Sequence, residues 1–142
     1  MIRKMTMDDV SQVAKLEKMI FTDPWSENVY RQTLELAEVA YLVVEIDGKL
    51  VGASGIRNIC GDGEITNVMI HPDYRGKGYS KTMLMELLEE GKRLGAENFT
   101  LEVRRGNQVA ISLYKSLGFV EEGIRPNFYE HPKEDAVIMW MR

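Results

Sequence analysis

The sequence is poor in the residues that cross-link a small domain or bind metal ions. Its 142 residues include one cysteine, Cys60, which excludes an internal disulfide and zinc sites built from several cysteines. The two histidines, His71 and His131, lie far apart and offer no metal-ligand spacing. No run approaches the ~20 apolar residues of a membrane span, and the first residues lack the apolar stretch of a signal peptide. We therefore expect a cytoplasmic protein with no bound metal and no membrane partner.

Neither sign of charge dominates the composition. Acidic residues number 22 and basic residues 18, which gives a net charge of −4. This balance argues against broad electrostatic binding to nucleic acid, so we expect no nucleic-acid partner. The hydrophobic share of 44% and the charged share of 28% are typical of a folded globular protein. Because no linker, repeat or low-complexity tract interrupts the chain, we expect a single domain over residues 1–142.

Hydrophobic periodicity and turn signals divide the chain into helices and strands. Apolar residues recur at helical spacing over about residues 8–20, 26–37, 78–94 and 107–116. Runs rich in β-branched and aromatic residues cover about residues 41–46, 50–56, 64–70, 99–104, 120–124 and 136–141, and Asp47-Gly48 is a strong hairpin signal. The order β-α-α-β-β-β-α-β-α-β-β predicts an α/β (α+β) domain. Its mixed, mostly antiparallel sheet of about seven strands would be flanked by about four helices.

The junction before the third predicted helix is the most informative stretch. Its sequence is Tyr74-Arg75-Gly76-Lys77-Gly78-Tyr79-Ser80-Lys81. The first N–H groups of a helix have no partner within it and lie at the positive end of its dipole. Glycines let a phosphate approach those groups and basic side chains add charge, so the junction predicts a pyrophosphate site. Alternatively, the glycines only form the turn and the lysines solvate the surface.

The two common nucleotide motifs do not fit this junction. A Walker loop needs Gly-x-x-x-x-Gly-Lys-Ser/Thr, which is absent, and a dinucleotide fingerprint needs glycine at the position of Lys81. Residues 75–80, Arg-x-x-Gly-x-Ser, instead resemble the acetyl-coenzyme A motif of the GNAT N-acetyltransferase superfamily, Gln/Arg-x-x-Gly-x-Gly/Ala. Downstream, residues 101–104, Asn107, Ala110 and residues 113–119 match that superfamily at its usual distances.

Other segments narrow the resemblance and extend it over nearly the whole chain. Residues 21–27, 125–129 and 134–139 are similar to those of the bacterial ribosomal-protein-alanine N-acetyltransferases, which acetylate the N-terminal amine of a small-subunit ribosomal protein. The resemblance implies a GNAT-like fold, acetyl-CoA as cosubstrate and direct transfer to a protein N-terminus in a ternary complex. Three positions depart from the pattern. Ser80 replaces Gly or Ala, Gly106 replaces a common Ser, and Phe128 replaces the first Tyr of a pair.

The resemblance also implies which residues bind the two substrates. The backbone of Val68, Met69 and Ile70 would run along the pantetheine arm, and the Asn107 side chain would bind the cofactor beyond the diphosphate. The diphosphate itself would be surrounded by Arg75, Gly76, Lys77, Gly78, Tyr79, Ser80 and Lys81. Trp25, Phe128 and Tyr129 would form the walls of the acceptor site, although such aromatic residues are equally typical of surface packing.

Amide formation from a thioester needs a base for the amine and a proton for the thiolate. The resemblance implies Glu102 as the base, and strand alternation places Glu102 opposite the face of the apolar residues between 99 and 103. A solvent-facing glutamate or a partner for Arg104 is the alternative. The implied acid is Tyr114, which lies seven residues after Asn107 and so on the same side of a helix. Without the resemblance, Tyr114 is typical of a core residue.

Two other functions remain open from the sequence. The same chemistry could act on a lysine side chain or a small amine, or the chain could be a non-catalytic CoA-binding regulatory module. The acidic surplus of the composition favours a basic acceptor only slightly.

Overall fold

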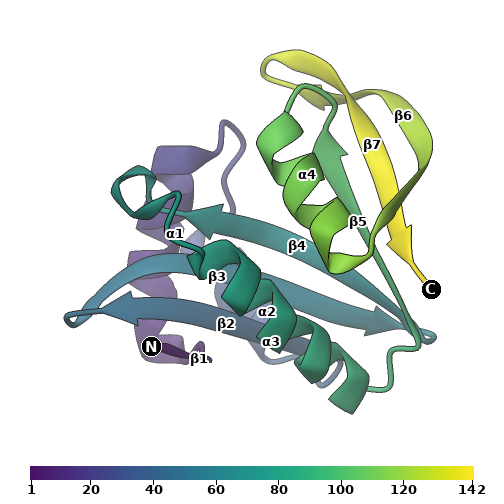
Figure 1. Cartoon of the computed structure of the whole chain (residues 1–142). Coiled ribbons are helices and arrows are strands. Elements are labelled where there is room, and N and C mark those ends of the chain that lie inside the picture. The colour runs from purple at the N-terminus through teal and green to yellow at the C-terminus, as the bar shows by residue number, and fades with distance from the viewer.

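The computed structural model describes residues 1–142 and contains one seven-stranded sheet (Figure 1). The strands are β1 (Ile2–Lys4), β2 (Val39–Ile46), β3 (Lys49–Ile59), β4 (Asp62–Ile70), β5 (Asn98–Arg104), β6 (Val120–Glu130) and β7 (Lys133–Met141). They lie in the order β1-β2-β3-β4-β5-β7-β6, and every neighbouring pair is antiparallel except β4 and β5. The predicted mixed, mostly antiparallel sheet is confirmed.

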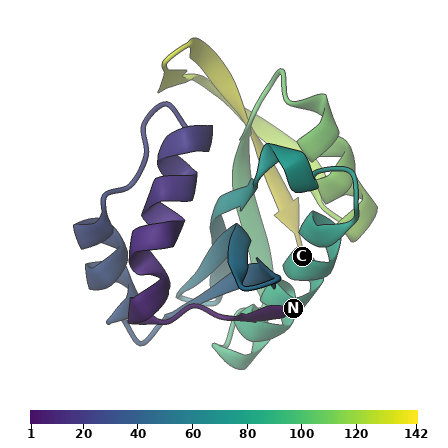
Figure 2. The same ribbon diagram turned by 90° about the vertical axis from the view of Figure 1, so that its left-hand side faces the viewer.

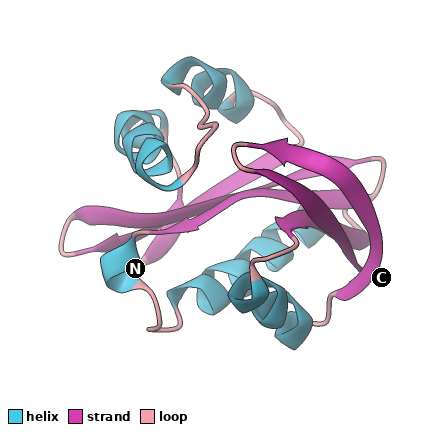
Figure 3. Cartoon of the chain, turned by 90° about the horizontal axis from the view of Figure 1, so that it is seen from above, coloured by secondary structure: helices cyan, strands magenta, loops and turns pink.

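Four α-helices cover the two faces of this sheet (Figure 3). They are α1 (Val10–Ile20), α2 (Glu27–Leu34), α3 (Tyr79–Arg93) and α4 (Gln108–Leu117), and short 3₁₀ turns, η1 (Met7–Asp9) and η2 (Pro72–Tyr74), precede α1 and α3. The sheet and helices α3 and α4 enclose the larger apolar core, and helices α1 and α2 enclose a smaller one on the opposite face. No helix is both long and apolar enough to cross a membrane.

Local sequence signals explain the turns on which this architecture depends. Asp47 and Gly48 both adopt positive φ, 49° and 78°, as a two-residue hairpin between β2 and β3 requires. Gly118 ends α4 at φ 110°, and the N–H of Phe119 then donates to the carbonyl of Tyr114. Phe119 is thereby buried in the core beside α4.

The last two strands are longer than the sequence predicts. The pattern predicted strands over 120–124 and 136–141, whereas β6 continues to Glu130 and β7 begins at Lys133. Pro126 lies where the register between β6 and β7 shifts, between Arg125 and Tyr129, and proline cannot donate to a neighbouring strand. Since β6 is the edge of the sheet, one side of it has no strand to bond, and a proline is tolerated there.

The central strands β4 and β5 pair over only three residues. Asp62, Gly63 and Glu64 face Asn98, Phe99 and Thr100, and beyond Glu64 the two strands diverge (Figure 1). Residues 65–70 of β4 therefore have no strand on that side, and part of their backbone hydrogen-bonding capacity is left open. This gap in the middle of the sheet positions the site described next.

Candidate active site

A cavity of about 530 Å³ occupies the gap between β4 and β5. Its walls come from α1, the α1–α2 loop, β4, β5, α4 and the β6–β7 hairpin. Glu102 lines it from one face of β5, whereas Leu101 and Val103 line it from the other. The cavity therefore passes between the strands and connects the two faces of the sheet.

Glu102 presents a half-buried carboxylate to this cavity. Its neighbours Leu101 and Val103 are buried in the core of the opposite face, as strand alternation predicted. Oε2 of Glu102 is buried without a hydrogen-bond partner, and the nearest cation is Arg125, whose Nε lies 3.6 Å away. Burial raises the pKa of Glu102, repulsion from Glu64 adds to the rise, and Arg125 opposes it. Such a carboxylate is a suitable proton acceptor.

Tyr114 reaches the same cavity from α4. Its ring is buried against Phe119, with ring centroids 6.1 Å apart, and the side chain belongs to the core and lines the cavity. The hydroxyl makes no hydrogen bond within the protein, and burial raises its pKa well above the ordinary value for tyrosine. The phenol is therefore protonated at neutral pH and free to donate a proton into the cavity.

A buried carboxylate that the sequence analysis missed joins α1 to the rest of the site. Glu17 is 1% exposed and accepts hydrogen bonds from the Tyr30 hydroxyl, the Trp25 backbone N–H and, at 2.9 Å, Nδ2 of Asn67. Trp25 belongs to the α1–α2 loop and Asn67 to β4. Glu17 thus ties the loop that walls the cavity to the strand that borders the gap.

Asn67 marks an irregularity in β4. Its φ is 57°, and the register between β3 and β4 shifts at this point, which is the signature of a β-bulge. The Tyr41 hydroxyl donates to Oδ1 of Asn67 at 3.2 Å, so side chains of α1 and β2 hold the bulge of β4 in place. Asn67, at the bulge, and Val68, the next residue, both line the cavity.

The junction between β4 and α3 has the backbone geometry that an anion requires. Gly76 and Gly78 adopt positive φ, 77° and 84°, and a Cβ added to either would meet no atom within 4 Å. The first helical bond runs from the N–H of Thr82 to the carbonyl of Gly78, so the three preceding N–H groups have no partner in α3. Open space in front of unpartnered N–H groups fits a diphosphate.

The side chains predicted at this junction differ in how they are placed. Arg75 donates from Nε to the carbonyl of Ile70 at 3.0 Å, so it braces the turn between β4 and α3. Lys77 is exposed, with Nζ 5.4 Å from the centre of the Tyr74 ring, and Lys81 is exposed on the first turn of α3. Met69 and Ile70 are buried, so only their backbone is available to a ligand.

Asn107 and the acceptor-side aromatic residues also lie around the cavity. Oδ1 of Asn107 caps α4 by accepting from the N–H of Ala110 at 3.2 Å, which leaves its Nδ2 free. Trp25, Phe128 and Tyr129 line the cavity from the α1–α2 loop and the β6–β7 hairpin.

The α1–α2 loop and the β6–β7 hairpin meet at one end of the molecule (Figure 2), where Asp23 Oδ2 lies 3.4 Å from His131 Nδ1. Arg104 does not pair with Glu102. It stacks 4.2 Å above the ring of Tyr129 and pairs with Glu134. Arg104 therefore fixes the hairpin side of the cavity, and Glu102 is left free of that partner.

Comparison with known proteins decides the family of this chain. The profile of the Acetyltransferase (GNAT) family matches residues 10–119. The chain belongs to the GNAT family of acetyltransferases. It is an N-acetyltransferase that uses acetyl-CoA, as predicted.

Relatives resemble this acetyltransferase over its whole length. A Bacillus subtilis protein with the provisional name ribosomal protein bS18-alanine N-acetyltransferase is 40% identical over 141 residues, 99% of this chain and 93% of the relative. The ribosomal protein bS18-alanine N-acetyltransferase of Escherichia coli K12 is 29% identical over 97% of this chain and 94% of its own.

The crystal structure of the E. coli ribosomal-protein-S18-alanine N-acetyltransferase confirms the GNAT fold. It superposes with a TM-score of 0.89, covers 99% of this chain and 92% of its own, and is 29% identical. The narrower resemblance to ribosomal-protein-alanine N-acetyltransferases is confirmed by the same similarities.

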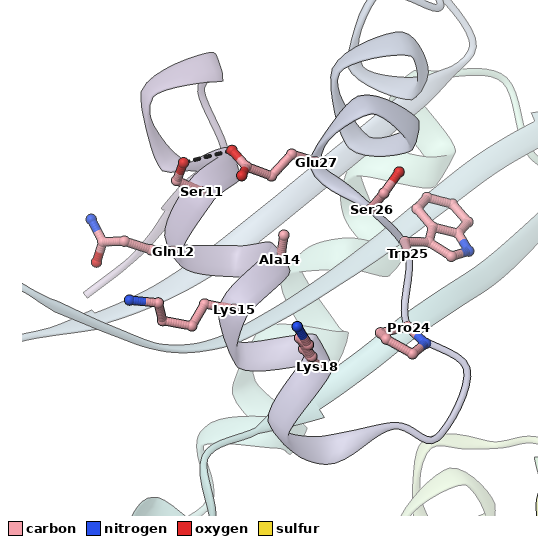
Figure 4. A pocket seen from close by; sticks show the side chains of 9 residues that line it. All are labelled: Ser11, Gln12, Ala14, Lys15, Lys18, Pro24, Trp25, Ser26 and Glu27. Atoms are coloured by element: carbon pink, nitrogen blue, oxygen red, sulfur yellow. Dashed lines mark hydrogen bonds between the residues drawn. The ribbon is translucent and has the colours of Figure 1, made fainter.

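A second cavity of the acetyltransferase, which we call the outer groove, lies on the far side of Trp25 (Figure 4). It measures about 570 Å³ and lies between α1 and the start of α2. Ser11 donates to Glu27 Oε1 at 2.6 Å across it, and Lys15 and Lys18 project from α1. The outer groove does not reach the gap between β4 and β5, so we place the chemistry in the central cavity.

Proposed function

We propose that this acetyltransferase transfers the acetyl group of acetyl-CoA to the N-terminal α-amine of ribosomal protein bS18 in a ternary complex. The observation that carries the proposal is the 40% identity over 99% of the chain to a relative provisionally named for that reaction. In this account residues 1–142 form one catalytic domain, which works in the cytoplasm where ribosomal proteins are made.

The β4–α3 junction would hold the cosubstrate. Backbone groups of Val68, Met69 and Ile70 would lie along the pantetheine arm, and Nδ2 of Asn107 would donate to the cofactor beyond the diphosphate. The diphosphate would contact the residues of the junction, Arg75, Gly76, Lys77, Gly78, Tyr79, Ser80 and Lys81. Acetyl-CoA, when bound, supplies the thioester carbonyl that is the acyl donor. Backbone N–H groups of β4 near Val68, where β5 no longer pairs with β4, would donate to the carbonyl oxygen as it gains negative charge.

Glu102 acts as the general base in this proposal. An N-terminal ammonium has a pKa of about 7.8 and a lysine ammonium about 10.4, so deprotonating the lysine at neutral pH costs about 3.5 kcal/mol more. A carboxylate whose pKa is raised by burial can accept the proton of an α-amine, directly or through a water. This difference favours an α-amine over a lysine as the acceptor.

Tyr114 acts as the general acid, and the aromatic walls orient the acceptor. The buried hydroxyl of Tyr114 has no competing partner and can protonate the departing thiolate. Trp25, Phe128 and Tyr129 would flank the first residues of the acceptor. Because Phe128 stands where the family commonly has Tyr, this wall offers one hydroxyl fewer to the acceptor.

Mass spectrometry of ribosomal proteins tests the proposal. Ribosomes from cells with and without this chain are compared, and bS18 is expected to lose its N-terminal acetyl group when the chain is absent. An unchanged bS18 N-terminus would contradict the proposal. A new difference at a lysine would instead favour a side-chain acceptor.

A further inference from the structure

Glu64 lies at the point where the sheet opens. It is the last residue of β4 that pairs with β5, and its partner across the parallel pair is Thr100. Paired residues of adjacent strands project to the same face, and so do residues two apart on one strand. Glu64 therefore shares a face with Glu102, and both side chains line the central cavity.

The carboxylate of Glu64 has no partner within the chain. It takes part in none of the side-chain hydrogen bonds or ion pairs of the structure, although it is half-buried. Arg57 stands opposite Glu64 on β3, but its guanidinium pairs with Glu38 at 3.0 Å. The cation nearest to Glu102 is Arg125, at 3.6 Å and largely exposed. Two carboxylates thus line the same cavity, and the exposed Arg125 is the one cation that pairs with either of them.

Two like charges are costly in a partly buried site, and a cation bound beside both of them lowers that cost. The substrate supplies such a cation, because an amine acceptor arrives largely as its ammonium form near neutral pH. We propose that Glu64 and Glu102 together form a binding site for the acceptor ammonium, which we call the ammonium seat. In it Glu64 attracts the positive charge of the ammonium, and Glu102 accepts its proton. This inference rests on the proposed function for the role of Glu102.

The proton balance is consistent with separate roles. One N–H proton moves to the Glu102 carboxylate and leaves a neutral amine, whose lone pair forms the C–N bond to the thioester carbon. The C–S bond breaks, the sulfur keeps the electron pair and takes the Tyr114 proton, and a second nitrogen proton restores Tyr114. The proton on Glu102 passes to solvent. Glu64 takes no part in these proton transfers, so its role lies in binding the ammonium and in its effect on the pKa of Glu102.

Other titratable groups line the cavity with this pair. They are Glu17 on α1, Asp23 on the α1–α2 loop, Arg104 on β5, Tyr114 on α4, and Tyr129 and His131 of the β6–β7 hairpin. Arg57 on β3 lies opposite Glu64, the electrostatic field of Glu64 reaches Tyr41 on β2, and Arg125 on β6 pairs with Glu102. Repulsion from Glu64 contributes to the raised pKa of Glu102. Removing the Glu64 charge therefore lowers the pKa of Glu102, and the acid limb of the pH profile of kcat/KM should move to lower pH.

Calorimetry in the presence of CoA tests the seat directly. A peptide with the N-terminal residues of bS18 and its N-acetylated form are titrated into the wild type, Glu64→Gln and Glu64→Asp. Glu64→Gln is expected to weaken binding of the free-amine peptide by about tenfold and to leave the acetylated peptide unchanged. Glu64→Asp should restore part of the affinity. Asp62→Asn is the matched control, because it removes a charge from the same strand face outside the cavity and should change neither titration.

Steady-state kinetics separates this inference from the function on which it rests. In Glu64→Gln the acceptor KM should rise about tenfold and the acetyl-CoA KM should not change. The acid limb of the pH profile of kcat/KM should shift to lower pH. Equal affinity of Glu64→Gln and wild type for the free amine, or an equal loss for both peptides, would overturn the ammonium seat. If the wild type fails to acetylate the bS18 peptide, the proposed function fails, and the seat is tested with whichever amine in a peptide and polyamine panel is acetylated.

Discussion

Replacing Glu17 by alanine should destabilise the protein more than almost any other single change at the acceptor side. The substitution removes the acceptor of three hydrogen bonds, from Tyr30, the backbone of Trp25, and Asn67. Tyr30 is fully buried, so its hydroxyl cannot turn to bulk water, whereas Asn67 lines the cavity and can be hydrated. The Tyr30 hydroxyl is therefore the donor that loses its partner at full cost, whereas the Trp25 N–H, like Asn67, borders the cavity and can be hydrated.

The magnitude follows from the buried Tyr30 hydroxyl and from the two hydrogen bonds made by Trp25 and Asn67. A buried donor without a partner costs about 1–3 kcal/mol, and each of the two hydrogen bonds whose donors can be hydrated contributes about 0.5–1.5 kcal/mol. We expect Glu17→Ala to lower the free energy of unfolding by about 4 kcal/mol. For a domain of this size, that loss corresponds to a fall in Tm of roughly 12 °C.

Urea denaturation of the purified protein, followed by circular dichroism, measures this loss. Glu86→Ala is the control, because Glu86 is exposed on α3 and pairs with no residue, and it should change stability by less than about 0.5 kcal/mol. A loss below about 1 kcal/mol in Glu17→Ala would refute the reasoning, since the network would then contribute little to folding. If Glu17→Ala keeps the urea midpoint of the wild type but raises the acceptor KM, Glu17 positions the α1–α2 loop and does not stabilise the fold.

Three further predictions concern catalysis, cofactor binding and acid stability. Glu102→Gln and Tyr114→Phe should each lower kcat by about 10²–10⁴-fold while calorimetry still detects CoA binding, and unchanged turnover would contradict the assigned roles. Gly78→Val should raise the acetyl-CoA KM at least about tenfold, because φ is 84° at this position and the new side chain enters the space expected to hold the diphosphate. An unchanged KM would contradict the placement of the diphosphate beside Gly78. Arg3 lowers the pKa of Asp9 in the folded protein. The ion pair therefore stabilises the fold fully above the pKa of an unfolded aspartate, about 3.9, and this stabilisation is lost as the pH falls through the lower pKa of the folded state. Asp9→Asn should cost about 1 kcal/mol at pH 7 and much less at pH 2, and urea unfolding at both pH values checks the difference.

The elements with strong local signals could be predicted from the sequence. Asp47-Gly48 predicts its hairpin because few residue pairs accept positive φ at both positions. Glu102 could be placed opposite the buried face of its strand because alternation is a property of the strand alone. The extension of β6 through Pro126 could not, because tolerance of a proline depends on the strand being at the sheet edge, which is a tertiary property.

The Glu17 network escaped prediction because its partners lie up to 50 residues away along the chain. One local signal was nevertheless present. Val10, Val13, Glu17 and Ile20 follow helical spacing, so Glu17 stands within the apolar stripe of α1 where a charge requires a buried partner. Glu64 gave no such signal, because a glutamate on a strand is ordinarily solvated, and only the divergence of β4 and β5 places it beside Glu102.

The most direct test of the account is acetylation of one peptide that offers both kinds of amine. The peptide carries the bS18 N-terminus and an internal lysine, and it is incubated with the purified protein and acetyl-CoA near neutral pH. Tandem mass spectrometry then locates the acetyl group. The account predicts acetylation of the α-amine alone, and its loss in Glu102→Gln. Acetylation of the lysine, or equal acetylation by Glu102→Gln, would contradict it.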